Sequence, residues 1–157
     1  MQKEMSDLMK GNNKKKVLIV PCSGIGKTYG TVSREAAYEV VENVRPTRTQ
    51  LVPLSLLVMG DENSRESVTQ NPAVTIDGCK LACATKMVQE SGGTVARDFA
   101  VLDVYRKHRE YKPKGIAELN EGGVKLASVL AEEVAEVVDD LEINIHSDQD
   151  SEGGSNG

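Results

Sequence analysis

The chain has 157 residues, enough for one domain built around a single hydrophobic core. Its net charge of −5 excludes the basic profile of a nucleic-acid binder, and no apolar run approaches the roughly 18 residues of a membrane span. Aliphatic residues dominate the apolar fraction, with one Phe and no Trp, which favours helices packed on a parallel sheet.

The segment 1–14 carries Glu4 and Asp7 and has no apolar stretch, so we expect no signal peptide. Its methionines predict a flexible arm that can form a short amphipathic helix. Three cysteines are an odd number, which argues against a disulfide framework and predicts reduced thiols in the cytoplasm. We therefore expect one cytoplasmic domain over residues 15–145.

The first predicted strand covers residues 16–21, a continuous apolar run that ends in a glycine-rich turn. A helix is expected from Thr31 until Pro46 ends it, because Val and Ala recur there with helical spacing. Residues 49–52 and 73–76 are the next predicted strands. The stretch between them is too short in its apolar part and too polar in the rest to be assigned.

A helix should follow the third strand from Gly78 to about Ser91, with Asp77 as its N-cap. Residues 94–99 are predicted as a fourth strand, and residues 101–114 are ambiguous.

The last helix is the clearest, because residues 123–141 place their aliphatic side chains in one stripe. The ending, residues 146–157, is rich in Ser, Asp and Gly and is predicted to be a disordered tail.

Strands and helices thus alternate, which predicts a Rossmann-like, three-layer α/β sandwich with a mostly parallel sheet. Functional groups in such folds gather at the carboxyl ends of the strands. Cys22 follows the first predicted strand and Cys79 follows the third. If these strands are neighbours, the two cysteines meet at one edge of the sheet.

Cys79 and Cys83 are four residues apart, so on a helix they project from the same face. A helix amino end favours anions and lowers thiol pKa values, and Cys22 lies in a similar setting. We therefore predict a metal centre on Cys22, Cys79 and Cys83. The alternative is that all three are small, inert core residues.

Residues 21–28 differ by one residue from the phosphate-binding loop G-x-x-x-x-G-K-[ST], because Pro21 replaces the leading glycine. A degenerate nucleotide-binding protein is therefore a lesser alternative. A thiol redox enzyme is another, although its usual spacing is C-x-x-C rather than the C-x-x-x-C seen here. The residues expected to surround a bound cofactor are Ser23, Gly24, Gly26, Lys27, Asp77 and Gly78.

The motif Asp77-Gly78-Cys79 with Cys83, preceded by a strand that ends in Cys22, resembles the DGC-domain family of zinc-binding proteins. The resemblance covers roughly residues 16–93 and implies bound zinc. The family has a fourth cysteine after the second strand, where this chain has none.

Structural zinc takes four ligands, so the fourth here would be Asp77, His108, Ser55 or water. A 4Fe–4S cluster on three cysteines would leave one iron open, and we favour it slightly over zinc.

These features predict an accessory or regulatory protein rather than a stand-alone enzyme. We expect it to respond to redox state or oxygen and to dock on a larger enzyme complex, without binding nucleic acid or inserting into a membrane. The resemblance associates such chains with anaerobes, including methanogens, and with a corrinoid or nickel methyltransferase system as the client. The enzyme alternative is a small metal-dependent oxidoreductase or transferase.

Overall fold

The structure, a computed structural model, describes residues 15–24 and 26–151. Its middle layer is a four-stranded sheet in the order β2-β1-β3-β4, in which every neighbouring pair is parallel. The strands are β1 (Val17–Pro21), β2 (Thr49–Leu51), β3 (Ala73–Asp77) and β4 (Val95–Ala100). The predicted α/β class and its parallel sheet are therefore confirmed.

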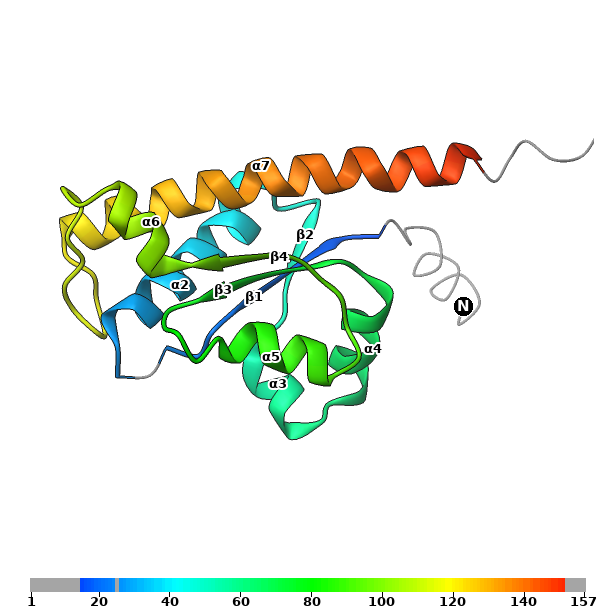
Figure 1. Ribbon diagram of the computed structural model, residues 1–157, viewed down its shortest axis with the longest axis horizontal. Coiled ribbons are helices and arrows are strands. Elements are labelled where there is room, and N and C mark those ends of the chain that lie inside the picture. Colours follow the sequence, from blue (N-terminus) through cyan, green and yellow to red (C-terminus); the bar gives the residue numbers. More distant parts are fainter. Residues whose placement is uncertain (1–14, 25, 152–157) are drawn as a thin grey trace, which may run out of the picture.

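Helices cover both faces of the sheet (Figure 1). One face carries α2 (Thr28–Glu39), the π-helix η1 (Val40–Val44), α6 (Val101–Lys107) and α7 (Glu121–Ser151). The other face carries α3 (Leu54–Met59), α4 (Glu62–Gln70) and α5 (Cys83–Glu90). This arrangement is the three-layer sandwich that the alternating pattern predicts.

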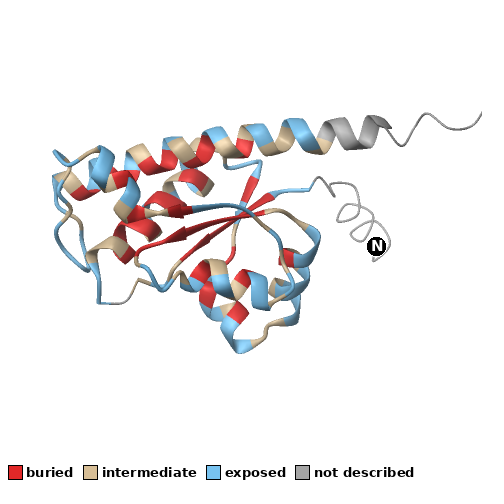
Figure 2. Ribbon diagram, in the orientation of Figure 1, coloured by how far each residue is buried: buried red, intermediate tan, exposed pale blue. Residues whose placement is uncertain are grey.

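Each strand divides its side chains between two hydrophobic cores, because successive residues of a strand point to opposite faces. Val17 and Ile19 of β1 pack with α2 and α7, whereas Leu18 and Val20 pack with α3 and α5. All five residues of β1 are buried, as Figure 2 shows for the centre of the sheet. A strand buried on both faces explains the unbroken apolar run in the sequence.

The chain changes direction across the sheet between β1 and β3. β2 pairs with one side of β1, and β3 pairs with the other side, with Pro21 opposite Ile76. The predicted adjacency of these two strands is confirmed. Ligands of open parallel sheets bind at such a switch point, beyond the carboxyl ends of the strands.

The helices differ from the predictions mainly in their bounds. α2 begins at Thr28, three residues before the predicted start, and α3, α4 and α6 form in stretches that the sequence pattern leaves unassigned. Helices this short have too few turns to show a helical periodicity in the sequence. They are stabilised by tertiary packing, since Leu57 and Val68 are buried in the core of the second face.

α7 continues to Ser151, well beyond the predicted end at residue 141. Its Asp139 forms an ion pair with Arg45, with Nη2 and Oδ2 2.7 Å apart, which joins the helix to the end of η1. The predicted arm at residues 1–14 and the end of the predicted tail, residues 152–157, lie outside the described residues.

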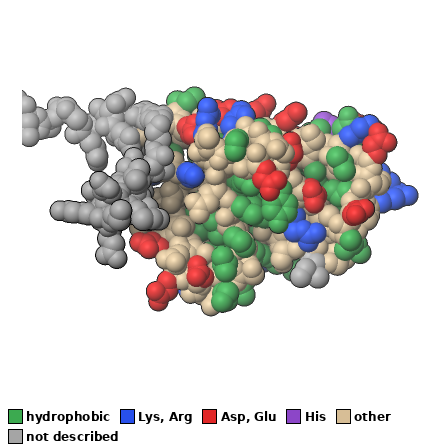
Figure 3. All heavy atoms as spheres, turned by 180° about the vertical axis from the view of Figure 1, so that it is seen from behind, with side chains coloured by type: hydrophobic (Ala, Val, Ile, Leu, Met, Phe, Trp, Pro, Cys, Tyr) green, Lys and Arg blue, Asp and Glu red, His purple; other side chains and the backbone are tan. Residues whose placement is uncertain are grey.

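Charged side chains of both signs are distributed over the face opposite to the view of Figure 1, around a central group of hydrophobic side chains (Figure 3). Within the described part of the chain, no helix combines the length and the apolar character needed to cross a bilayer.

Candidate functional site

A cavity of about 190 Å³ lies where β1 and β3 end, at the switch point of the sheet. The residues that line it are Cys22, Ser23, Gly24, Lys27, Gly30, Asp77, Gly78, Cys79, Leu81 and Cys83. The structure therefore brings together all three predicted metal-ligating cysteines and every predicted cofactor-binding residue except Gly26. Gly26 belongs to the same loop but is exposed and does not line the cavity.

Cys22 is anchored by the strand beside it. Its backbone N–H donates to the carbonyl of Ile76 at 2.9 Å, and the buried Ser33 hydroxyl donates to the same carbonyl at 2.6 Å. Burial raises the pKa of the Cys22 thiol, although the Gly78 N–H and the Ser33 hydroxyl act in the opposite direction. The predicted lowering of this pKa is therefore wrong for the free thiol, because desolvation outweighs the nearby donors.

The two loops that carry the cysteines both pack against the first turn of α2 through glycine backbones. A Cβ on Gly78 would lie 2.8 Å from the backbone nitrogen of Gly30, and a Cβ on Gly24 would lie 2.5 Å from the carbonyl carbon of Gly30. Gly24 also has a φ of +65°, which side-chain-bearing residues rarely adopt. Glycine at these positions lets the loop after β1 and the loop after β3 both approach the first turn of α2.

Asp77 is a buried residue whose carboxylate is fully used by α5. Its Oδ1 accepts from the Ala84 N–H at 2.8 Å, and its Oδ2 accepts from the N–H and the hydroxyl of Thr85 at 3.2 and 2.8 Å. The prediction that Asp77 is the N-cap of this helix is wrong in position, because the N-cap of α5 is Ala82, but the Asp77 carboxylate does accept from amides of the first turn of α5. These bonds argue against Asp77 as a ligand of zinc or magnesium, since both oxygens already accept hydrogen bonds inside the fold.

The predicted start of that helix at Gly78 is wrong, because α5 begins at Cys83. Cys79 lies in a turn closed by the Ala82 N–H, which donates to the Cys79 carbonyl at 3.2 Å. Ala82 has a φ of +51°, the only positive φ among the described non-glycine residues. The chain therefore makes a strained turn between the two cysteines, which do not share a helix face.

The three thiols line one cavity but do not form a ready-made coordination sphere. Among the residues that the structure describes, no three His, Cys, Asp or Glu side chains come close enough together to hold a metal ion. Cys22 and Cys79 are half-buried and Cys83 is exposed, and none of them is in a disulfide. The donor set suits a soft metal, and coordination by all three thiols requires them to come closer together than they are in this structure.

The other candidate ligands do not reach this site. Neither Ser55 nor His108 lines the cavity. The His108 ring stacks on Tyr111, and its Nδ1 lies 3.7 Å from a carboxylate oxygen of Glu110.

Sequence reasoning missed Gly30, Ser33 and Leu81. Gly30 has a weak sequence signal, because it is the third glycine after Cys22. Ser33 and Leu81 have no sequence signal. The strand order brings Ser33 to the cysteines, and the turn after β3 brings Leu81 there.

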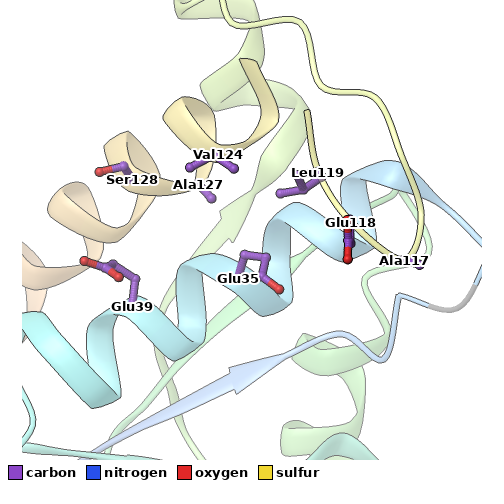
Figure 4. A pocket seen from close by; sticks show the side chains of 8 residues that line it. All are labelled: Glu35, Glu39, Ala117, Glu118, Leu119, Val124, Ala127 and Ser128. Carbon is purple, nitrogen blue, oxygen red and sulfur yellow. The ribbon is translucent and has the colours of Figure 1, made fainter. Parts of the chain in front are cut away.

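A second hollow, of about 410 Å³, lies between α2 and α7 (Figure 4). Its lining residues are Glu35, Glu39, Ala117, Glu118, Leu119, Val124, Ala127 and Ser128. It contains no thiol and none of the predicted site residues, and the Glu39 carboxylate already accepts a hydrogen bond from Asn43 at 2.8 Å. The candidate site is therefore the cysteine-lined cavity.

The family model of the DGC domain matches residues 18–140, a range that contains all three cysteines and all of the sheet except Val17. No curated protein and no solved structure shows a significant match to the chain.

Proposed function

The chain belongs to the DGC-domain family, and from this premise we propose that it binds a metal centre through Cys22, Cys79 and Cys83. One observation carries the proposal: Cys22 and the neighbouring pair Cys79 and Cys83, which lie far from Cys22 in the sequence, line a single cavity at the switch point of the sheet. Three cysteines that served only as core filler would be expected in the hydrophobic clusters, and none of them belongs to either cluster.

Burial raises the pKa of the Cys22 thiol, but several groups around the cavity favour thiolates. Cys83 is the first residue of α5, and Gly30 lies in the first turn of α2, so two helix amino ends face the cavity. Lys27 adds a positive charge at the rim, and the only carboxylate of the lining, Asp77, is bound by donors of α5. Zinc would supply Lewis acidity at this place, whereas an iron–sulfur cluster would supply one-electron chemistry and sensitivity to oxygen.

Metal analysis of the protein purified without air tests this proposal. We expect one centre per chain, either one zinc without colour or about four irons with acid-labile sulfide and a brown spectrum. Metal-free protein, even after reconstitution with zinc or with iron and sulfide, would overturn the proposal. The same measurement decides between the two metals.

Single replacements assign the ligands. Cys22→Ser, Cys79→Ser and Cys83→Ser are each expected to reduce metal content by most of one equivalent and to lower the melting temperature of the metal-loaded protein, since metal binding adds to the stability of the folded state. Leu81→Ala is the matched control, because Leu81 lines the same cavity but has no donor atom. Full metal content in any one cysteine variant would remove that residue from the site.

The role of the centre stays a prediction. We propose an accessory protein that docks on a larger complex, and the 63% exposure of Leu81 at the rim of the cavity supports a contact surface there. We also propose that the centre responds to oxygen, with a slight preference for an iron–sulfur cluster over zinc. The alternative is a small metal-dependent oxidoreductase or transferase.

A further inference from the structure

We propose that the second hollow, between α2 and α7, is a docking site for a basic, amphipathic segment of a partner protein. The inference goes beyond the proposed metal centre, because none of the three cysteines lines this hollow. It follows from the charge of the lining, the separation of its carboxylates and the exposure of its apolar side chains.

The charged side chains of the lining are all acidic. Glu35 and Glu39 lie on α2, and Glu118 lies on the segment that connects α6 to α7 (Figure 4). Neither the Glu35 nor the Glu118 carboxylate has a hydrogen bond or an ion pair with another described residue. No described Lys or Arg lines the hollow, and Lys125, which follows Val124 on α7, already pairs with Glu121 at 2.9 Å. The lining therefore favours a positively charged occupant.

The positions of the carboxylates narrow the kind of cation. Among the residues that the structure describes, no three His, Cys, Asp or Glu side chains come close enough together to hold a metal ion. The three glutamates of the hollow thus do not converge on one divalent cation. Several positive charges that are spread along a chain match them better, and the Lys and Arg side chains of a peptide provide that spacing.

The apolar side chains explain why a partner segment, and not a bare polycation, fits the hollow. Ala127 is buried and Leu119 is half-buried, whereas Val124 is 56% exposed. The Thr31 hydroxyl of α2 donates to the carbonyl of Ile116 at 2.6 Å, which holds the connecting segment against α2. The hollow is therefore built before any partner binds. Aliphatic side chains beside carboxylates complement a helix that is apolar on one face and basic on its flanks.

A second copy of the chain fits the hollow less well. A two-fold contact places the same surface of both copies face to face, so the glutamates of one hollow would meet those of the other. Like charges brought together across an interface cost free energy. The whole chain carries a net charge of −5, which repels a second copy and attracts a basic partner.

Three model peptides test the charge and the apolar face separately. Each has about 14 residues, or four helical turns, in one amphipathic pattern, built from Leu and Lys, from Ser and Lys, or from Leu and Glu. They are added to the full chain, isotope-labelled for nuclear magnetic resonance and without added metal. We expect the Leu–Lys peptide to bind most tightly and to shift the amide signals of residues 35–39 and 117–128. The Ser–Lys peptide should bind more weakly, and the Leu–Glu peptide should not shift these signals.

Replacing glutamates locates the charge. Glu35→Gln together with Glu118→Gln should weaken the Leu–Lys peptide about two- to twentyfold, the effect of two exposed ion pairs, and should make binding less sensitive to salt. Glu62→Gln together with Glu90→Gln is the matched control, because it changes the net charge equally on α4 and α5, which cover the other face of the sheet. All four glutamates are exposed, so neither double change threatens the fold.

Val124→Ser tests the apolar contact. It should weaken the Leu–Lys peptide about two- to fivefold, because less apolar surface is buried, and should leave the Ser–Lys peptide unchanged. Val58→Ser is the matched control, since Val58 is 64% exposed on α3 and does not line the hollow.

Other occupants give different results. Equal effects of the two double variants, or shifts elsewhere in the chain, mean that the peptide binds acidic surface in general. Spermidine that shifts the same amides at the same concentration as the Leu–Lys peptide assigns the hollow to a small polyamine. Self-association that Val124→Ser abolishes assigns it to a second copy, and a deletion of residues 1–13 that shifts the same amides assigns it to the chain's own amino-terminal segment. Each of these results overturns the partner segment, and none of them bears on the cysteines of the proposed metal centre.

Discussion

Asp77 is the residue whose role the structure changes most. In the sequence it stands beside Cys79 and is a natural candidate for a metal ligand. In the fold it is 4% exposed and joins the end of β3 to the first turn of α5. Thr85, which donates to Asp77, also forms a hydrogen bond with Thr75 of β3 at 2.7 Å. Asp77 therefore acts as a positioning residue for the two cysteines that follow it.

Replacements of Asp77 distinguish a positioning residue from a metal ligand, and the first measurement is of stability. Asp77→Ala leaves the Ala84 and Thr85 amides without their acceptor, so we expect the free energy of unfolding to fall by about 1–3 kcal/mol. Asp77→Asn should lose less, because its carbonyl oxygen can still accept one bond. Urea unfolding of the metal-free protein measures both, with Asp98→Asn on the exposed side of β4 as the control.

Metal binding then distinguishes a positioning residue from a ligand. If Asp77 only positions the cysteines, the Asp77→Asn protein should still bind one metal per chain. Loaded with cobalt(II) without air, it should show the same visible spectrum as the unaltered protein. A folded Asp77→Asn protein with an altered spectrum would place a carboxylate oxygen on the metal and contradict our assignment.

At the scale of the elements, the site depends on how closely the two loops approach each other. Gly78 after β3 and Gly30 in α2 pack backbone to backbone, and this junction holds Cys79 and Cys22 around one cavity. A side chain at Gly78 would meet backbone atoms of Tyr29 and Gly30 at 2.9 and 2.8 Å, which cannot rotate away.

Gly78→Ala should therefore push the loop after β3 away from the first turn of α2. We expect a loss of about 1–3 kcal/mol in the free energy of unfolding, as for other overpacked sites, together with weaker metal binding. Gly26→Ala is the matched comparison, because Gly26 has a φ of +81° but nothing within 4 Å of an added Cβ. It should cost about 1–2 kcal/mol through backbone strain and leave metal affinity nearly unchanged. Equal losses of metal affinity in both variants would show that loop strain, and not the close packing, controls the site.

Much of this element-level arrangement follows from the sequence. The apolar runs before Cys22 and Cys79 predict buried parallel strands, and their adjacency places both cysteines at one edge, as observed. The start of α5 does not follow, because the sequence of residues 78–82 is compatible with a helix, whereas in the structure Gly78 packs against α2 and Ala82 has a positive φ. The raised pKa of Cys22 does not follow from the sequence either, since it depends on burial that no local pattern reveals.

At the scale of the whole molecule, the fold and the site are built from different parts. Two hydrophobic clusters hold the sheet between its helices, and neither includes a cysteine. The cavity lies at the carboxyl edge of the sheet, outside both clusters, and its walls are two loops and two helix starts. The sandwich should therefore fold without metal, and the metal should order only the edge.

Hydrogen exchange followed by mass spectrometry tests this separation. Metal loading is expected to slow exchange in residues 22–24, 26–30 and 78–85, whose amides belong to the loops and first turns around the cavity, because bound thiols restrict their local opening. α3, on the second face, and α7, held by the ion pair of Arg45 with Asp139, should exchange alike with and without metal. Cys22→Ser with added metal is the control and should show no protection at either loop. Exchange as fast as in an unfolded chain throughout the metal-free protein would contradict a metal-independent sandwich and would make the centre part of the fold itself.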